Sequence, residues 1–142
     1  MKVSLDTSFI VPLVAAPSRF HERTLACFEQ FQKDGAEFVL AGHALLESFS
    51  VLTRSPEPFK VLPRHAERAL RETFADATIT GFARHAPWKA MEHTISRGHH
   101  GGRIYDTAIA LAAFEAGARL LLTWNAKHFL SIAPAGLEIR VP

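Results

Sequence analysis

Short apolar runs alternate with segments of helical periodicity along this 142-residue chain, and this alternation is the feature that most restricts its fold. The runs that we expect to form strands are 2–5, 37–40, 77–80, 119–122 and, at an edge, 137–141. The segments with helical spacing or helix boundary signals are 7–15, 18–33, 42–53, 63–74, 87–96 and 105–116. Apolar strands separated by helices are typical of a parallel sheet covered on both faces. The length suits a single domain, so we expect one α/β domain over 1–142 with a central, mainly parallel sheet of four to five strands.

Composition excludes several other classes of protein. Hydrophobic residues make up 48% and charged residues 21%, which is typical of a folded globular chain rather than a disordered one. No apolar run approaches the roughly 20 residues that span a bilayer, and Asp6 interrupts any signal-peptide pattern. The single cysteine fits a reducing compartment, so we expect a cytoplasmic protein. The net charge of +2 is compatible with a nucleic-acid partner without requiring one.

Two polar segments directly follow predicted strands. Asp6 comes after the first strand, and Thr123-Trp124-Asn125 follows the fourth. In open parallel sheets, binding sites form beyond the carboxyl ends of the strands. Asp6 either caps the next helix or supplies charge to such a site. Asn125 is either a turn residue or a neutral oxygen ligand.

Two further carboxylates lie on predicted helices. The helical neighbours of Asp106 on its C-terminal side are all apolar, so its face of the helix points toward the sheet. A buried carboxylate needs a capping role, a basic partner or a metal ion. Glu47 has mostly polar helical neighbours, so a solvent-exposed face is an equal alternative for it. Together, Asp6, Glu47, Asp106 and Asn125 offer the hard oxygen ligands that Mg²⁺ or Mn²⁺ prefers, which points to a metal-dependent nuclease.

The order of four short motifs resembles that of PIN-domain ribonucleases. They are LDTSFIV at the start, Glu47 in the helix after the second strand, IYDTAIALA around Asp106, and LLTWNAKHF after the fourth strand. The size of the chain and its early first motif are similar to the VapC toxins of toxin–antitoxin pairs. The resemblance implies a PIN-like three-layer α/β/α sandwich and a Mg²⁺- or Mn²⁺-dependent endoribonuclease. It also implies RNA as substrate, a cognate antitoxin and a homodimer.

The resemblance also assigns roles to individual residues. Asp6, Glu47 and Asp106 match the acids that gather the metal. We expect Asp6 and Asp106 to hold the ion directly and Glu47 to orient or deprotonate the attacking water. Ser8 matches the hydroxyl beside the first acid.

Thr123 and Asn125 match a T-x-D/N segment of the same family. Many relatives carry Asp where this chain has Asn125, so the site has one negative charge fewer. We interpret this as weaker or single-metal binding, with Asn125 positioning a metal-bound water. The change also supports an alternative function, a catalytically weak or inactive PIN-fold module that binds RNA or protein.

Basic and aromatic residues near these motifs are further candidates for substrate contacts or for packing. Arg103 is the favoured phosphate contact, or otherwise the charge partner of Asp106. His128 is expected near the mouth of the site, with Phe129 anchoring the last loop. We expect Trp88 to pack on the core, the alternative being that it stacks on an RNA base.

Overall fold

The computed structural model describes residues 1–81, 83–84 and 86–142, and its centre is a five-stranded parallel sheet. In chain order, the strands are β1 (Lys2–Leu5), β2 (Glu37–Ala41), β3 (Thr78–Thr80), β4 (Leu120–Leu122) and β5 (Glu138–Arg140). Their spatial order is β3-β2-β1-β4-β5, and every neighbouring pair is parallel. The predicted α/β architecture is therefore confirmed.

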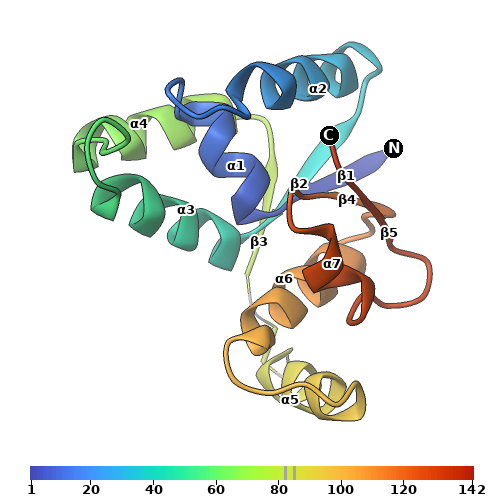
Figure 1. The fold of residues 1–142 in the computed structure, drawn as a ribbon. Helices are drawn as coiled ribbons and strands as arrows, with labels where there is room; N and C mark the ends of the chain where they lie inside the picture. The colour runs from blue at the N-terminus through green and yellow to red at the C-terminus, as the bar shows by residue number, and fades with distance from the viewer. Residues whose placement is uncertain (82, 85) are drawn as a thin grey trace.

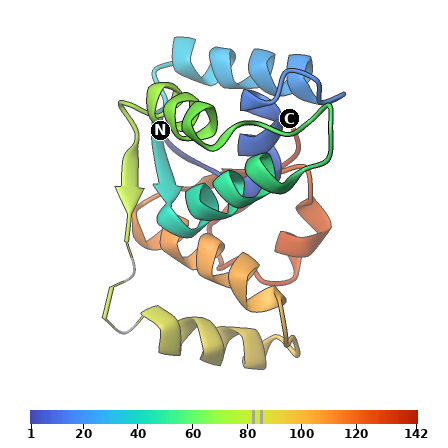
Figure 2. The same cartoon turned by 90° about the vertical axis from the view of Figure 1, so that its left-hand side faces the viewer.

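Helices cover both faces of this sheet and complete three layers (Figures 1 and 2). One layer contains α1 (Thr7–Val14), α2 (His21–Lys33), α3 (Gly42–Arg54) and α4 (Pro63–Thr73). The opposite side carries α5 (Ala86–Ser96), α6 (Arg103–Glu115) and α7 (Ala126–Leu130), with α5 packed on α6 away from the sheet. Within the described residues, no helix is both long and apolar enough to cross a membrane.

Chain order explains why the helices divide in this way. The chain moves outward from β1 to β2 and β3, then returns across the sheet to β4. Right-handed crossovers put the helices of the outward and return paths on opposite faces. The direction reverses between β1 and β4, and such a switch point leaves a crevice at the carboxyl ends of the strands.

The register of the two central strands fixes what lies in that crevice. Val3, Leu5 and the three leucines of β4 are at most 1% exposed, so these strands form the middle of the core. Leu5 pairs with Leu122, and the Asp6 backbone N–H continues the ladder to the Leu122 carbonyl at 3.1 Å. Asp6 and Thr123 are therefore the first residues beyond the paired strands.

Two helix predictions differ from the structure. The second helix begins at His21 rather than after Ser18, because the Ser18 carbonyl accepts from His21 N–H and its Oγ accepts from the Phe20 N–H at 3.3 Å in a preceding turn. The five-residue α7 was not predicted, since so short a helix shows no periodicity. Phe129 within it is 1% exposed and anchors this segment as expected.

The expectation that Trp88 packs on the core is wrong. Trp88 is 63% exposed. The buried residues of α5 are Ala90 and Thr94, so the helix packs on α6 through small side chains and turns Trp88 outward.

Candidate active site

Asp6 is buried at the carboxyl end of β1 and acts as the N-cap of α1. Its Oδ2 atom accepts three hydrogen bonds, from the Ser8 N–H at 3.1 Å, the Ser8 hydroxyl at 2.6 Å and the Thr123 hydroxyl at 2.9 Å. Its Oδ1 atom receives none from the residues that the structure describes. Capping and site formation are therefore compatible here, because one carboxylate oxygen serves the cap and the other stays free.

The residues around Asp6 form one hydrogen-bonded network across the switch point. The Ser8 and Thr123 hydroxyls lie 3.0 Å apart. The Trp124 backbone N–H donates to Ser8 Oγ at 3.0 Å, and the Asn125 N–H donates to Thr123 Oγ1 at 2.9 Å. The strand-end segments that follow β1 and β4 thus hold the Asp6 carboxylate from two sides.

Asp106 lies in the first turn of α6 and is partly buried, without a capping hydrogen bond. Burial and the neighbouring Asp6 carboxylate raise its pKa; the charges of His128 and Arg103 oppose the rise, and Glu47 adds to it. His128 Nδ1 is 3.6 Å from the Asp106 carboxylate. The structure therefore brings the three predicted acids within electrostatic range of one another.

Glu47, on the second turn of α3, is anchored by residues that sequence analysis did not identify. Its carboxylate accepts from the Thr7 hydroxyl at 3.3 Å and lies 3.6 Å from His43 Nε2. The His43 ring stacks on Tyr105, with ring centroids 5.0 Å apart and planes inclined by 6°. Thr7 follows Asp6 and His43 precedes Glu47 by one helical turn, which were available signals, whereas nothing in the sequence indicated Tyr105.

The remaining predicted residues lie at the border of the site. The Asn125 side chain is exposed and makes no hydrogen bond to the described residues. Arg103 donates from Nη2 to the His128 carbonyl at 2.6 Å and to the Ser131 hydroxyl at 3.0 Å. Arg103 thus ties α6 to α7 and positions His128 beside Asp106.

The carboxylates of the site determine which coordination of a hard divalent cation it could support. Within the described residues, no three Asp, Glu, His or Cys side chains are close enough to hold an ion. Mg²⁺ is usually bound by only one or two protein carboxylates and keeps several waters. Asp6 and Asp106 offer such a pair, and a cation would offset both the burial and the Asp6 repulsion that raise the Asp106 pKa. The site fits Mg²⁺ or Mn²⁺ with two direct carboxylate ligands better than a three-carboxylate cage.

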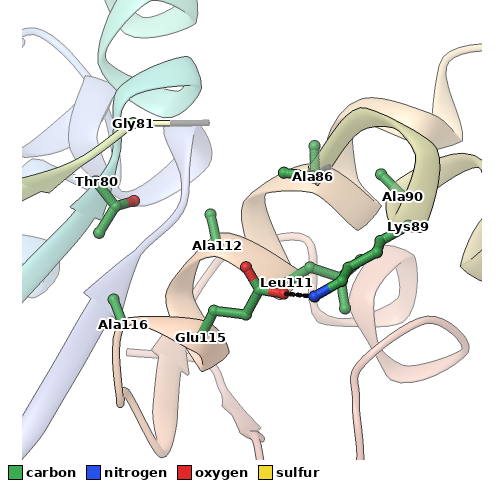
Figure 3. Close-up of a pocket in the computed structure, with 10 residues that line it drawn as sticks. Thr80, Gly81, Ala86, Lys89, Ala90, Leu111, Ala112, Glu115 and Ala116 are labelled. Carbon is green, nitrogen blue, oxygen red and sulfur yellow. Dashed lines mark hydrogen bonds and ion pairs between the residues drawn. The ribbon is translucent and has the colours of Figure 1, made fainter. Parts of the chain in front are cut away.

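A separate cavity of about 210 Å³ lies between the end of β3 and helices α5 and α6 (Figure 3). Among the described residues, ten line it and five of these are alanines, and the Lys89 ammonium lies 3.3 Å from Glu115 across it. None of the predicted site residues lines it. Its lining lacks the convergent oxygen ligands that metal-assisted chemistry needs.

Comparison with known proteins gives two curated relatives from Mycobacterium tuberculosis. Ribonuclease VapC27 is 34% identical over 120 residues, which cover 83% of this chain and 81% of that protein. Ribonuclease VapC40 is 28% identical over 122 residues, covering 84% of each. No family model matches the chain.

Solved structures share the fold at low sequence identity. VapBC2 from Rickettsia felis, determined bound to a promoter DNA fragment, matches with a TM-score of 0.71 at 19% identity and covers 100% of this chain and 99% of its own. VapC20 from Mycobacterium tuberculosis, a toxin that cleaves the sarcin–ricin loop, matches with a TM-score of 0.72 at 15% identity, covering 97% and 98%.

Proposed function

Because the chain belongs to the VapC family of ribonucleases, we propose that it is a metal-dependent endoribonuclease and the toxin of a cytoplasmic toxin–antitoxin pair. The observation that carries this proposal is the pairing of Asp6 with Asp106. Asp6 is buried and held by three hydrogen bonds on one oxygen, and burial together with the Asp6 charge raises the pKa of Asp106 on a separate helix. Carboxylates whose pKa is shifted by burial and by a neighbouring carboxylate occur at functional sites more often than elsewhere.

Each residue of the site would have a different role in phosphodiester hydrolysis. Asp6, through its free Oδ1, and Asp106 would hold Mg²⁺ or Mn²⁺, which supplies charge neutralisation of the phosphate and a more acidic water. Glu47 is half exposed and held by Thr7 and His43, so its carboxylate can accept a proton from the attacking water. His128 is half exposed beside Asp106 and can contact the phosphate at the mouth of the site.

The test is cleavage of end-labelled single-stranded RNA by the purified protein, with Mg²⁺ and with EDTA. We expect cleavage that needs the metal, is abolished in Asp6→Ala and persists in Arg64→Ala, which changes an exposed residue of α4. RNA that is bound yet never cut under any metal condition would instead favour the binding module that Asn125 permits.

An exposed apolar groove supports the proposal of an antitoxin partner. The groove has a volume of about 470 Å³ and is bordered by Glu67 and Arg71. Its apolar lining comes from α3, α4, the turn between α4 and β3, and the middle of β3, and consists of Leu45, Leu46, Phe49, Leu70, Phe74, Ala75, Ala77 and Ile79. An amphipathic helix buries its apolar face in a groove of this kind. We propose this α3–α4 groove as the antitoxin surface.

A second apolar surface lies on the outer side of α5. Trp88, Met91 and Ile95 follow at helical spacing and are 63%, 45% and 73% exposed. A helix face of this kind can pack against its own copy around a twofold axis. We propose this α5 face as the homodimer contact.

A further inference from the structure

Trp124 connects the acidic site to the beginning of α2. Its indole ring packs on Phe20, with centroids 4.4 Å apart and planes inclined by 33°, and its Nε1 donates to the buried Thr24 hydroxyl at 3.0 Å. Its backbone N–H donates to Ser8 Oγ, which in turn donates to Asp6. The aromatic pair Phe20–Trp124 is therefore held in a fixed position relative to the catalytic carboxylate.

Two exposed arginines stack on this aromatic pair. The Arg19 guanidinium carbon lies 4.6 Å from the centroid of the Phe20 ring, and that of Arg23 lies 5.4 Å from the Trp124 ring. Among the described residues, neither guanidinium has an ion pair or a hydrogen-bond partner. Stacking holds a guanidinium through its flat face and leaves the N–H donors at its edge free.

These two residues differ from other arginines of the chain. On α4, Arg68 and Arg71 each pair with a glutamate one helical turn away. Arg103 uses Nη2 on the backbone and hydroxyl of the α7 segment. Aromatic rings therefore orient the Arg19 and Arg23 side chains, and no carboxylate among the described residues neutralises their charge. Both guanidinium groups can thus bind an anion from outside the protein.

A nuclease site built from three acids repels the phosphates of its own substrate. Cations at the border of such a site compensate for this repulsion, and stacked arginines present two parallel donors that match a phosphate. We propose that Arg19 and Arg23, held on Phe20 and Trp124, bind successive backbone phosphates of a single RNA strand and direct it to Asp6. This inference rests on the proposed ribonuclease function and names the path of its substrate.

Equilibrium binding of a fluorescent single-stranded RNA 20-mer tests the inference. The measurement uses the full chain carrying Asp106→Asn, so that the RNA stays intact, and covers a range of salt concentrations. We expect Arg19→Ala/Arg23→Ala to weaken binding by roughly 10- to 100-fold at about 0.1 M salt. The slope of log affinity against log salt should fall by about 1.4, because each lost contact to single-stranded RNA contributes about 0.7.

Two further variants separate charge from geometry. Arg68→Ala/Arg71→Ala removes the same charge from α4 and should leave the slope within about 0.3 of the parent value, because these side chains are already paired. Arg19→Lys/Arg23→Lys should keep most of the slope but lose part of the affinity, since an ammonium group stacks and binds phosphate less specifically.

The outcomes distinguish this inference from the proposed function. Wild-type cleavage together with unchanged RNA binding by Arg19→Ala/Arg23→Ala would overturn the inference and leave the ribonuclease proposal intact. If Arg19→Ala/Arg23→Ala binds RNA normally but no longer co-purifies with the cognate antitoxin, the two arginines contact the protein partner instead. That result would also overturn the inference. If the wild-type chain neither binds nor cuts RNA, the proposed function fails and the inference fails with it.

Discussion

The two carboxylates of the proposed metal pair are prepared for their roles in different ways. Asp6 is oriented before any ligand arrives, because three donors converge on its Oδ2 atom. Asp106 has His128 at 3.6 Å as its only ion-pair partner among the described residues, and burial and the Asp6 charge raise its pKa. The Asp6 carboxylate is thus fixed in orientation, whereas the negative charge of Asp106 is disfavoured by burial and by Asp6.

The substitution Asp106→Asn tests this division of roles. We expect RNA cleavage to fall by at least about 100-fold, because a direct metal ligand supplies several kcal/mol to the transition state. The raised pKa means that folding favours the protonated form, so the charged side chain lowers the free energy of unfolding at pH 7. The variant should therefore be at least as stable as wild type at pH 7. This difference should vanish below about pH 3.9, where the carboxyl is protonated in both states.

Cleavage rates and urea unfolding at pH 7 and at acidic pH check this expectation. Asp76→Asn, an exposed acid in the turn before β3, is the matched control and should alter neither quantity appreciably. A collapse in stability of Asp106→Asn at pH 7 would show that Asp106 is a structural residue of α6.

The Thr123 hydroxyl is fully buried and has two hydrogen-bond partners: it donates to Asp6 and accepts from the Asn125 N–H. Thr123→Val keeps the shape but leaves these groups without their partner. We expect the free energy of unfolding to fall by about 1–3 kcal/mol, which is the usual cost of unsatisfied buried polar groups. Urea denaturation measures this loss, with Thr53→Val as control, because the partners of the Thr53 hydroxyl among the described residues are carbonyls of its own helix. Equal stability of the two variants would contradict the structural role of the network.

At the scale of elements, α7 depends on its neighbours for its position. A helix of five residues is not stable by itself. Three basic side chains of the α5–α6 segment hold it and the turn that follows. They are Arg103 on the His128 carbonyl and Ser131, His99 on the Ser131 hydroxyl at 2.9 Å, and His93 on the Ile132 carbonyl at 2.6 Å. The place of His128 at the site is therefore set by α5 and α6.

Arg103→Lys tests this dependence, because one ammonium group cannot reproduce the two contacts of Nη2. We expect faster backbone amide exchange in residues 126–132, with the strands unaffected, and a several-fold loss of cleavage through misplacement of His128. Hydrogen exchange measured by mass spectrometry locates the effect. Arg97→Lys, at the exposed end of α5, is the control. Unchanged amide exchange in residues 126–132 would show that Arg103 does not hold α7 in place. The phosphate contact predicted for Arg103 from the sequence would then be the better interpretation.

At the scale of the whole molecule, the proposed catalytic site and the proposed protein contacts occupy different surfaces. The acids lie at the switch point between β1 and β4, whereas the α3–α4 groove and the α5 face present the exposed apolar residues. Figure 2 shows α5 and α4 in opposite layers of the sandwich. The two proposed protein partners can therefore bind at the same time.

Two single substitutions test whether these surfaces are independent. Leu46→Asp, at a residue 73% exposed in the groove, should weaken antitoxin binding by about 100-fold or more and leave the homodimer intact. Ile95→Asp, also 73% exposed, should give the monomer and retain the antitoxin. Light scattering and pull-down of the antitoxin measure the two effects. Both variants should unfold like wild type, and loss of both interactions in either one would refute the assignment of separate surfaces.

The positions of most helices and strands, and of the acids on them, could be predicted from the amino-acid sequence alone. Strand and helix periodicity depends on neighbours within a few positions, so β1, β2, β4 and the long helices were predicted to within three residues at each end. Asp6 and Thr123 were recognised for the same reason, since each directly follows an apolar strand.

The contacts between side chains from distant parts of the chain could be known only from the folded structure. The contacts of Thr7 with Glu47, of His43 with Tyr105 and of Trp124 with Phe20 join segments that lie 40 to 104 positions apart. The exposure of Trp88 likewise depends on which face of α5 meets α6. Such partners are set by the crossover path and the sheet order, and a one-dimensional pattern does not encode these, because many different chains share the same strand and helix periods.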